Sequence, residues 1–204
     1  MTTTAPDISN ESVTADADTS TLRERKKQRT RQLLHEVAME LVRERGLAGV
    51  TVEEICAEAD VSTRTFFNYF STKAAAAVGL TSPVLRDDVL ESFHARRGDV
   101  GIVPDLCRVV AQTIDLPEDR ARMKELMDLR PELVPTMHAW MNEFRGQILT
   151  AVEARIGAET AGLAVALVMS AFMVALHGPS VTSRDELAER LVRTVAEMAE
   201  LAVR

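Results

Sequence analysis

The sequence predicts an all-α protein, with an N-terminal three-helix unit followed by a C-terminal helical bundle. Gly and Pro are sparse, with 9 and 7 among 204 residues, and apolar residues recur at helical spacing without strand-like alternation. Helix-capping residues stand at several of the expected starts. With 46% hydrophobic residues, the chain has enough apolar material for one or two small domains.

The first 21 residues predict a disordered acidic tail. They contain four acidic residues and no basic ones, and they lack an apolar run. This composition is unlike a secretory signal or a mitochondrial targeting helix, so we expect a cytoplasmic protein. The apolar stretch 161–176 is shorter than the roughly 20 residues of a membrane span, and we expect it to be a buried helix.

The formal net charge of -7 is unevenly distributed along the chain. The tail 1–21 carries -4, residues 22–73 carry +2, and residues 74–204 carry -5. Six of the ten basic residues in the middle segment lie between Arg23 and Arg31. We therefore do not expect the protein to bind polyanions without selectivity. We do expect the basic residues between Arg23 and Arg31 to make a local contact with phosphates.

The N-terminal unit begins with a helix predicted over 25–45, where Leu34, Val37 and Leu41 share one face flanked by Leu33, Ala38 and Val42. Gly46 follows in the position of a left-handed cap. Thr51 and Glu54 have the spacing of a capping box, which predicts a second helix over 52–59.

The next residues predict a helix-turn-helix. Asp60 and Val61 form a tight turn, Ser62 caps a third helix over 63–69, and Ser71 caps a fourth from residue 72. Pro83 is placed in the first turn of a helix that reaches residue 96. Further helices are predicted over 102–116, 118–129, 132–156, 160–177 and 184–203, the last opened by a capping box from Ser183 to Glu186.

The third helix separates an apolar face from a polar one. Phe66 and Phe70 are expected in the core, together with Val52, Ile55, Cys56, Ala59 and Val61. Thr63, Arg64, Phe67 and Asn68 remain exposed. Arg and Asn make bidentate contacts to guanine and adenine edges in a major groove. Ser62, Tyr69 and Lys73 at helix ends suit phosphate oxygens.

This stretch resembles the DNA-binding domain of the TetR family of transcriptional regulators over about residues 25–75. The resemblance rests on the glycine-ended first helix, the Thr before an Ile-containing second helix, and the ordered set Ala59, Val61, Ser62, Thr65, Phe66, Tyr69, Phe70 and Lys73. Asp60 replaces the family's usual Gly, a tolerable change because Asp visits left-handed backbone. Phe67 replaces a common Tyr, so an apolar contact to a thymine methyl takes the place of a phosphate contact.

The resemblance implies which residues face double-stranded DNA. We call residues 23–31, with their six basic side chains, the basic arm. This arm either enters a minor groove, contacts phosphates, or is a solvated surface. The predicted DNA-binding residues are Arg25, Lys26, Lys27, Arg29, Thr51, Ser62, Thr63, Arg64, Thr65, Phe67, Asn68, Tyr69 and Lys73.

The C-terminal domain is expected to mediate homodimerisation and ligand binding. In the TetR family, which this sequence resembles, two C-terminal helices from each subunit form a four-helix interface, and a dimer recognises two half-sites of a near-palindromic DNA sequence. Ordinary core packing is the alternative for the apolar stripes of the last two helices. The candidate interface residues are Val168, Leu187, Leu191, Val195 and Met198.

Methionine and aromatic residues predict a pocket for a hydrophobic effector, with plain core packing as the alternative. The stretch 130–140 is similar to the corresponding stretch in TetR-type regulators that bind acyl-CoA-like ligands, including those near mycofactocin clusters. That similarity implies that Arg96, Arg97 or Arg130 contacts a phosphate or carboxylate group of the ligand. The candidate pocket residues are Phe93, Met123, Met127, Met137, Trp140, Met141, Phe144, Met169, Phe172 and Met173.

No catalytic constellation, metal site or cofactor motif is predicted. The four His residues are scattered, and the two Cys residues, Cys56 and Cys107, are expected to be core residues. We therefore expect a ligand-responsive DNA-binding regulator, a repressor released by its effector. The alternative is a helical small-molecule carrier without specific DNA binding; an enzyme is not expected.

Overall fold

The computed structural model describes residues 11–96, 101–114, 120–178, 181 and 183–203. Across these ranges the secondary structure is helical and contains no strand, which confirms the all-α class. The chain forms two compact units, Met1–Thr81 and Ser82–Arg204. The division falls after Thr81 rather than after the predicted residue 73, because the fourth helix packs against the first.

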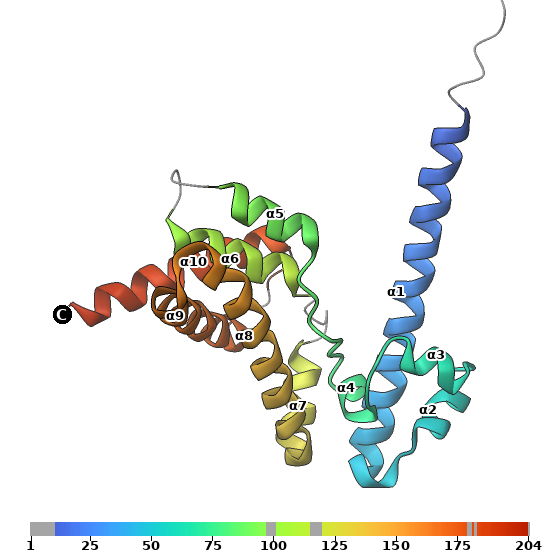
Figure 1. The fold of residues 1–204 in the computed structure, drawn as a ribbon. Helices are drawn as coiled ribbons and strands as arrows, with labels where there is room; N and C mark the ends of the chain where they lie inside the picture. The colour runs from blue at the N-terminus through green and yellow to red at the C-terminus, as the bar shows by residue number, and fades with distance from the viewer. Residues whose placement is uncertain (1–10, 97–100, 115–119, 179–180, 182, 204) are drawn as a thin grey trace, which may run out of the picture. The chain divides into compact units, whose positions relative to one another are not determined.

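Over residues 11–81, unit 1 consists of one long helix and three short ones. They are α1 (Glu11–Arg45), α2 (Val52–Glu58), α3 (Thr63–Phe67) and α4 (Lys73–Ala77), with a 3-10 turn, η1, at Leu47–Gly49. The short helices pack at the C-terminal part of α1, whose N-terminal part extends beyond them (Figure 1). The predicted disorder of residues 11–21 is not observed, since lengthening an existing helix requires no new nucleus. Residues 1–10 lie outside the described residues.

The core of unit 1 forms around one face of α1. Leu34, Ala38 and Val42 are fully buried, and Met39 is 2% exposed. Leu33 is 42% exposed, so its predicted place beside this face is wrong: it lies about 100° around the helix from Leu34. The other helices contribute Ile55, Cys56, Phe66 and the alanines 74–77, and the segment between α3 and α4 contributes Phe70.

A close contact joins α4 to α1. The His35 Nδ1 atom lies 2.8 Å from the Ala76 carbonyl oxygen. Gly79 has a φ of 69°, and a Cβ atom there would lie 3.0 Å from His35 Cε1. Glycine is thus favoured at position 79 for two reasons. It adopts the positive φ, and it leaves the space that the His35 imidazole occupies.

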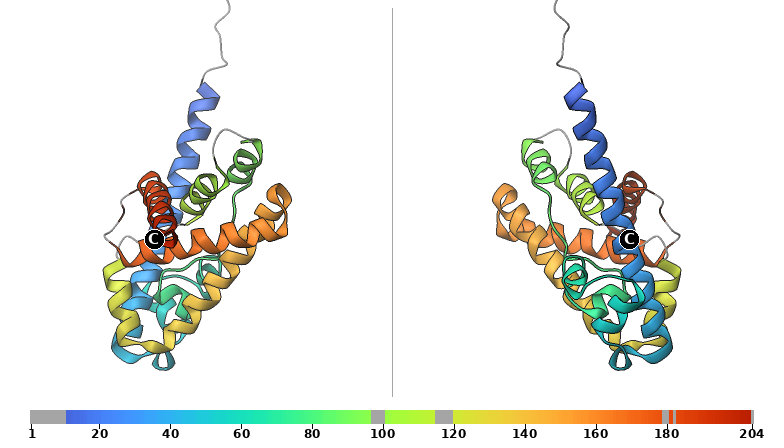
Figure 2. Two further views of the ribbon diagram at one scale, coloured as in Figure 1. Left: turned by 90° about the vertical axis from the view of Figure 1, so that its left-hand side faces the viewer. Right: turned by 90° about the vertical axis from the view of Figure 1, so that its right-hand side faces the viewer.

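In the part of unit 2 that the structure describes, six helices form a bundle with a 3-10 turn, η2 (Pro131–Leu133). The helices are α5 (Asp87–Ala95), α6 (Ile102–Thr113), α7 (Arg120–Leu129), α8 (Val134–Ile156), α9 (Ala158–His177) and α10 (Arg184–Ala202). α6 packs against α5, α9 and α10, while α8 packs against α9. Figure 2 shows these helices from two further sides. The core lies among α5, α6, α8, α9 and α10.

The caps follow the predictions with three exceptions, the first of which is Gly46: its φ of 74° is positive, but its ψ of 163° is not that of a left-handed cap. Thr51 and Glu54 form the reciprocal capping box, and Ser183 accepts the Glu186 amide. Thr72, rather than Ser71, caps α4 by accepting the Ala75 amide at 3.0 Å. Pro83 lies outside α5, which begins only at Asp87.

α9 is 20 residues long and apolar enough by length and composition to cross a membrane, so the predicted exclusion by length is wrong. Core helices of soluble proteins pass the same test. One side of α9, with Ala161, Val165, Val168 and Phe172, is buried in the core of unit 2, as predicted.

Both cysteines are buried free thiols, as predicted. Cys56 is 4% exposed and Cys107 is fully buried. Desolvation raises the pKa of the Cys107 thiol to about 11. A thiol that stays protonated is a poor nucleophile and metal ligand, so Cys107 acts as a small core hydrophobe.

The capping box makes a testable link between pH and stability. The Glu54 carboxylate accepts the Thr51 amide at 2.8 Å and the Arg45 guanidinium at 2.9 Å, and the Thr51 backbone bond is the main cause that lowers the pKa of Glu54. A lowered pKa contributes stability above the ordinary value of 4.5 that is lost as the pH falls through the folded value.

We therefore expect Glu54→Gln to be less stable than the native protein at pH 7, with the difference shrinking as the pH falls toward 3. Urea unfolding at both pH values measures this. Glu58→Gln on the same helix is the control, and an equal loss of stability in the two variants at pH 7 would contradict the capping role.

Candidate nucleic-acid interface

α3 is positioned by a defined turn. Asp60 has a φ of 52°, the left-handed backbone predicted for it. The Ser62 hydroxyl oxygen then accepts the Thr65 amide at 3.1 Å and lies 2.8 Å from the Thr65 hydroxyl. The helix therefore starts at a specified residue, which sets the face that each later side chain occupies.

Two phenylalanine rings, Phe66 in α3 and Phe70 shortly after it, hold α3 against the rest of unit 1. Phe66 is fully buried and Phe70 is 2% exposed, with their ring centroids 6.1 Å apart. Phe67 lies edge-on to Phe66 at 5.3 Å but is itself 58% exposed. The two anchoring rings thus confirm the predicted core and leave a neighbouring aromatic ring on the surface.

The outer side of α3 carries the predicted recognition residues. Thr63, Arg64, Phe67 and Asn68 are all exposed, with Asn68 at the C-terminal cap. A guanidinium, an amide and an apolar ring on one short helix match the donors, acceptors and methyl groups of a major groove. Such a surface suits the edges of base pairs.

Other candidates have partners inside the protein. Thr65 and Tyr69 are half-buried. The Thr51 hydroxyl donates to Glu54 at 3.0 Å. The half-buried Lys73 donates through Nζ to the Val50 carbonyl at 2.6 Å, so its ammonium ties α4 to the start of α2. Sequence analysis did not predict that role for Lys73.

The basic arm lies on α1. Arg25, Lys26, Lys27 and Arg29 are exposed, in a helical part of α1 that precedes its buried face. Arg25 and Arg29 are four residues apart and share one side of the helix. An exposed cationic helix of this kind suits contacts with a phosphate backbone.

Residues 34–76 match the family described as bacterial regulatory proteins, tetR family. This segment is therefore similar to the N-terminal domain of the TetR family. The matched segment runs from the buried Leu34 in α1 to Ala76 in α4, and therefore contains the helix-turn-helix and both anchoring phenylalanines. The comparison with curated proteins found no match.

Solved structures align with most of the chain at low identity. A TetR-family transcriptional regulator from Mesorhizobium loti MAFF303099 is 18% identical over 87% of this chain and 97% of its own, with a TM-score of 0.46. A TetR-family member from Streptomyces coelicolor A3 is 21% identical over 81% and 97%, with a TM-score of 0.40. The multidrug binding protein EbrR complexed with malachite green is 24% identical over 80% and 96%, with a TM-score of 0.39.

Beyond the TetR-type domain, the structure brings together some of the predicted pocket residues. Trp140 and Phe144 stack at 5.3 Å, and Phe144 meets Phe172 edge-on at 6.3 Å. Phe93, Met141 and Met169 belong to the same cluster, whereas Met173 is 41% exposed. Met123, Met127 and Met137 are half-buried and lie outside this cluster.

Most of the predicted dimer residues lie in the core of unit 2. Val168, Leu187 and Leu191 are at most 2% exposed, Val195 is 9% exposed, and Met198 packs against the same cluster. Their placement on a partner-facing surface is therefore corrected, because the stripe of α10 faces α6 and α9 of its own chain. The large hydrophobic residues of α9 that are exposed are instead Leu163, Met173 and Val174.

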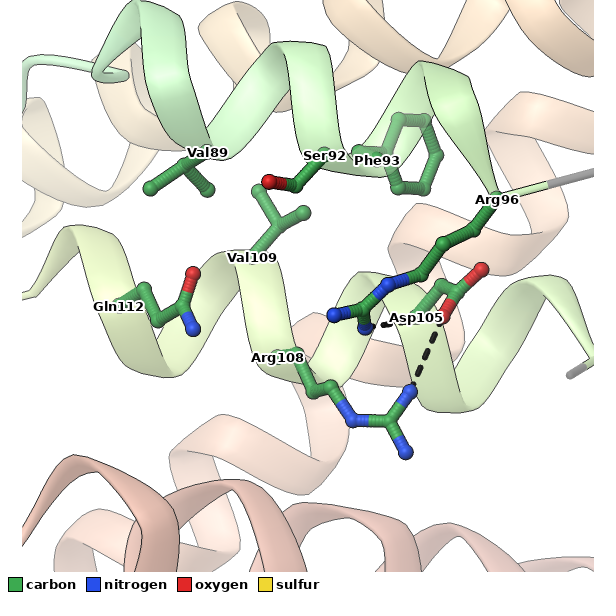
Figure 3. Close-up of a pocket in the computed structure, with 8 residues that line it drawn as sticks. All are labelled: Val89, Ser92, Phe93, Arg96, Asp105, Arg108, Val109 and Gln112. Atoms are coloured by element: carbon green, nitrogen blue, oxygen red, sulfur yellow. Dashed lines mark hydrogen bonds and ion pairs between the residues drawn. The ribbon is translucent and has the colours of Figure 1, made fainter.

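A polar cleft in unit 2 was largely missed by sequence analysis. It has a volume of about 50 Å³ and lies between α5 and α6 (Figure 3). Of its residues, Phe93 and Arg96 were singled out from sequence. Arg97 lies outside the described residues, and no metal-binding cluster of His, Cys, Asp or Glu is found among the described ones. The lining residues are Val89, Ser92, Phe93, Arg96, Asp105, Arg108, Val109 and Gln112.

Whether the Lys73 ammonium stabilises the fold, in addition to its predicted contact with DNA, can be tested by unfolding. We expect Lys73→Met to lower the free energy of unfolding by about 1.5 kcal/mol, because the Val50 carbonyl loses a charged donor. Urea unfolding measures the loss, with Lys124→Met on α7 as the control. A stability equal to that of the control would show that the ammonium does not support the fold.

Proposed function

We propose that the protein is a homodimeric, sequence-specific DNA-binding regulator, a repressor whose affinity for a near-palindromic operator falls when a hydrophobic effector binds unit 2. The main support is the five-residue α3, which exposes Arg64 and Asn68 above the buried Phe66. A carrier protein has no need for this combination of exposed base-recognising groups and a rigid anchor. The proposed location is the cytoplasm.

DNA recognition in this proposal combines two kinds of contact. Arg64, Asn68 and Phe67 meet base edges in a major groove. The arm Arg25–Arg29 neutralises phosphates, and its contribution falls as salt rises. With an acidic body and a net charge of -7, attraction to DNA of arbitrary sequence is weak, which favours selectivity.

The effector part of the proposal rests on unit 2. The aromatic residues Trp140, Phe144 and Phe172 form an apolar cluster with Met141 and Met169, whose flexible side chains can repack around a ligand. The resemblance to regulators of acyl-CoA-like ligands suggests the ligand class. The effector must bind the low-affinity conformation better than the DNA-bound one, for example by shifting α4.

The test begins with selection of bound genomic fragments, followed by mobility shifts on the selected operator. Arg64→Ala should weaken specific binding by about 5- to 150-fold, the loss of one bidentate base contact. Lys124→Ala removes one charge from an exposed position on α7 and should leave binding unchanged. Absence of any selected fragment would favour the carrier, and equal loss in both variants would contradict base recognition by Arg64.

The dimer interface is proposed on the exposed side of α9. Leu163 is 72% exposed and Val174 52% exposed, and exposed Ala166 and Ser170 lie between them at helical spacing. This apolar stripe gives a second copy a surface to cover.

We expect the double variant Leu163→Glu/Val174→Glu to be monomeric at concentrations where the native protein is a dimer, because the four added charges would face each other across a two-fold interface. Sedimentation measures the mass. Leu129→Glu, on the exposed surface of α7, is the matched control. A double variant that stays dimeric would place the interface elsewhere.

A further inference from the structure

The α5–α6 cleft is built around one buried carboxylate. The Asp105 side chain is 1% exposed, and its Oδ2 atom lies 3.1 Å from Arg155 Nη1 of α8. Arg155 is only 10% exposed; it also donates to the Phe93 carbonyl at 2.8 Å and to the Arg96 carbonyl, and its guanidinium lies 4.5 Å from the Phe93 ring centroid. Asp105 and Arg155 thus form a buried, neutral, hydrogen-bonded pair.

Two further guanidinium groups converge on the same carboxylate. Arg108 Nη1 lies 3.0 Å from Asp105 Oδ1, and Arg96 Nη1 lies 3.8 Å from that oxygen (Figure 3). Their side chains are 42% and 53% exposed, so both remain open to solvent on the cleft side. Since Arg155 already balances Asp105, this group of four carries two surplus positive charges.

Surplus cations around one oxygen repel each other, and a bound anion offsets that repulsion. The cleft also contains neutral donors, Ser92 of α5 and Gln112 of α6, along a wall formed by Val89 and Val109 (Figure 3). Guanidinium groups match the paired oxygens of carboxylates and phosphates. A volume of about 50 Å³ admits such a group but not a whole effector.

We propose that the α5–α6 cleft binds the oxyanion end of a small molecule, a phosphate or a carboxylate, between Arg96 and Arg108. Ser92 and Gln112 complete its hydrogen bonds, and Asp105 holds the two arginines in place. The inference rests on the proposed function for its biological meaning, since it supplies the charged end of the effector site. The binding itself requires no DNA.

The experiment titrates the ¹⁵N-labelled full-length protein, free of DNA, with inorganic phosphate, acetate or chloride at constant ionic strength. We expect saturable shifts of the Ser92, Phe93 and Gln112 amides with at least one oxyanion and none with chloride. The oxyanion that binds with the higher affinity, phosphate or acetate, identifies the head group. No saturable shift with either oxyanion would overturn the proposal.

Paired variants localise the site. Arg96→Gln/Arg108→Gln should weaken oxyanion binding by about tenfold or more, because two charge-assisted contacts are lost. Arg145→Gln/Arg193→Gln removes equal charge from exposed positions on α8 and α10 and should leave it unchanged. Equal weakening in the two pairs would reduce the effect to net charge and overturn the site. Arg64→Ala should keep oxyanion binding while losing operator binding, so the two proposals fail separately.

Discussion

The burial of two phenylalanine rings is the constraint on which the candidate nucleic-acid interface depends. α3 has only five residues, far fewer than an isolated helix needs for stability in water. Phe66 and Phe70 hold it against unit 1, while the left-handed Asp60 and the Ser62 cap determine where it begins. The outward direction of Arg64 and Asn68 follows from these contacts. A cavity at Phe66 would thus disturb the side chains that are proposed to face DNA without touching them.

Unit 2 depends on a polar contact of comparable importance. Asp105 and Arg155 are 50 residues apart, and together with the Phe93 carbonyl they join α5, α6 and α8. A buried carboxylate must be paired, because desolvation of an isolated charge costs several kcal/mol. The same pairing draws Arg96 and Arg108 to the edge of the core. A structural need of the bundle thereby places two exposed guanidinium groups at a small cleft, which is the arrangement that supports the oxyanion proposal.

Charge is used differently in the two units. In unit 1 the cations of the arm are spread along an exposed helix, which suits a long polyanion. In unit 2 the cations converge on one point and face a small cleft, which suits a single anionic group. The net charge of -7 conceals both features, because it averages local clusters with an acidic surface. Function in this chain is better explained by where charges converge than by their total.

The sequence alone determined the features that depend on neighbours within about four residues. These include most of the helix positions, the Thr51–Glu54 capping box, the turn at Asp60, and the division of α3 into buried Phe66 and exposed Arg64. Tertiary structure decided which apolar stripe each helix buries: Leu187 and Leu191 pack inside, while Leu163 stays outside. It also directed Lys73 to Val50 and assembled the arginines around Asp105. Helical periodicity reveals that a face is apolar, but only contacts between residues distant in sequence determine what covers it.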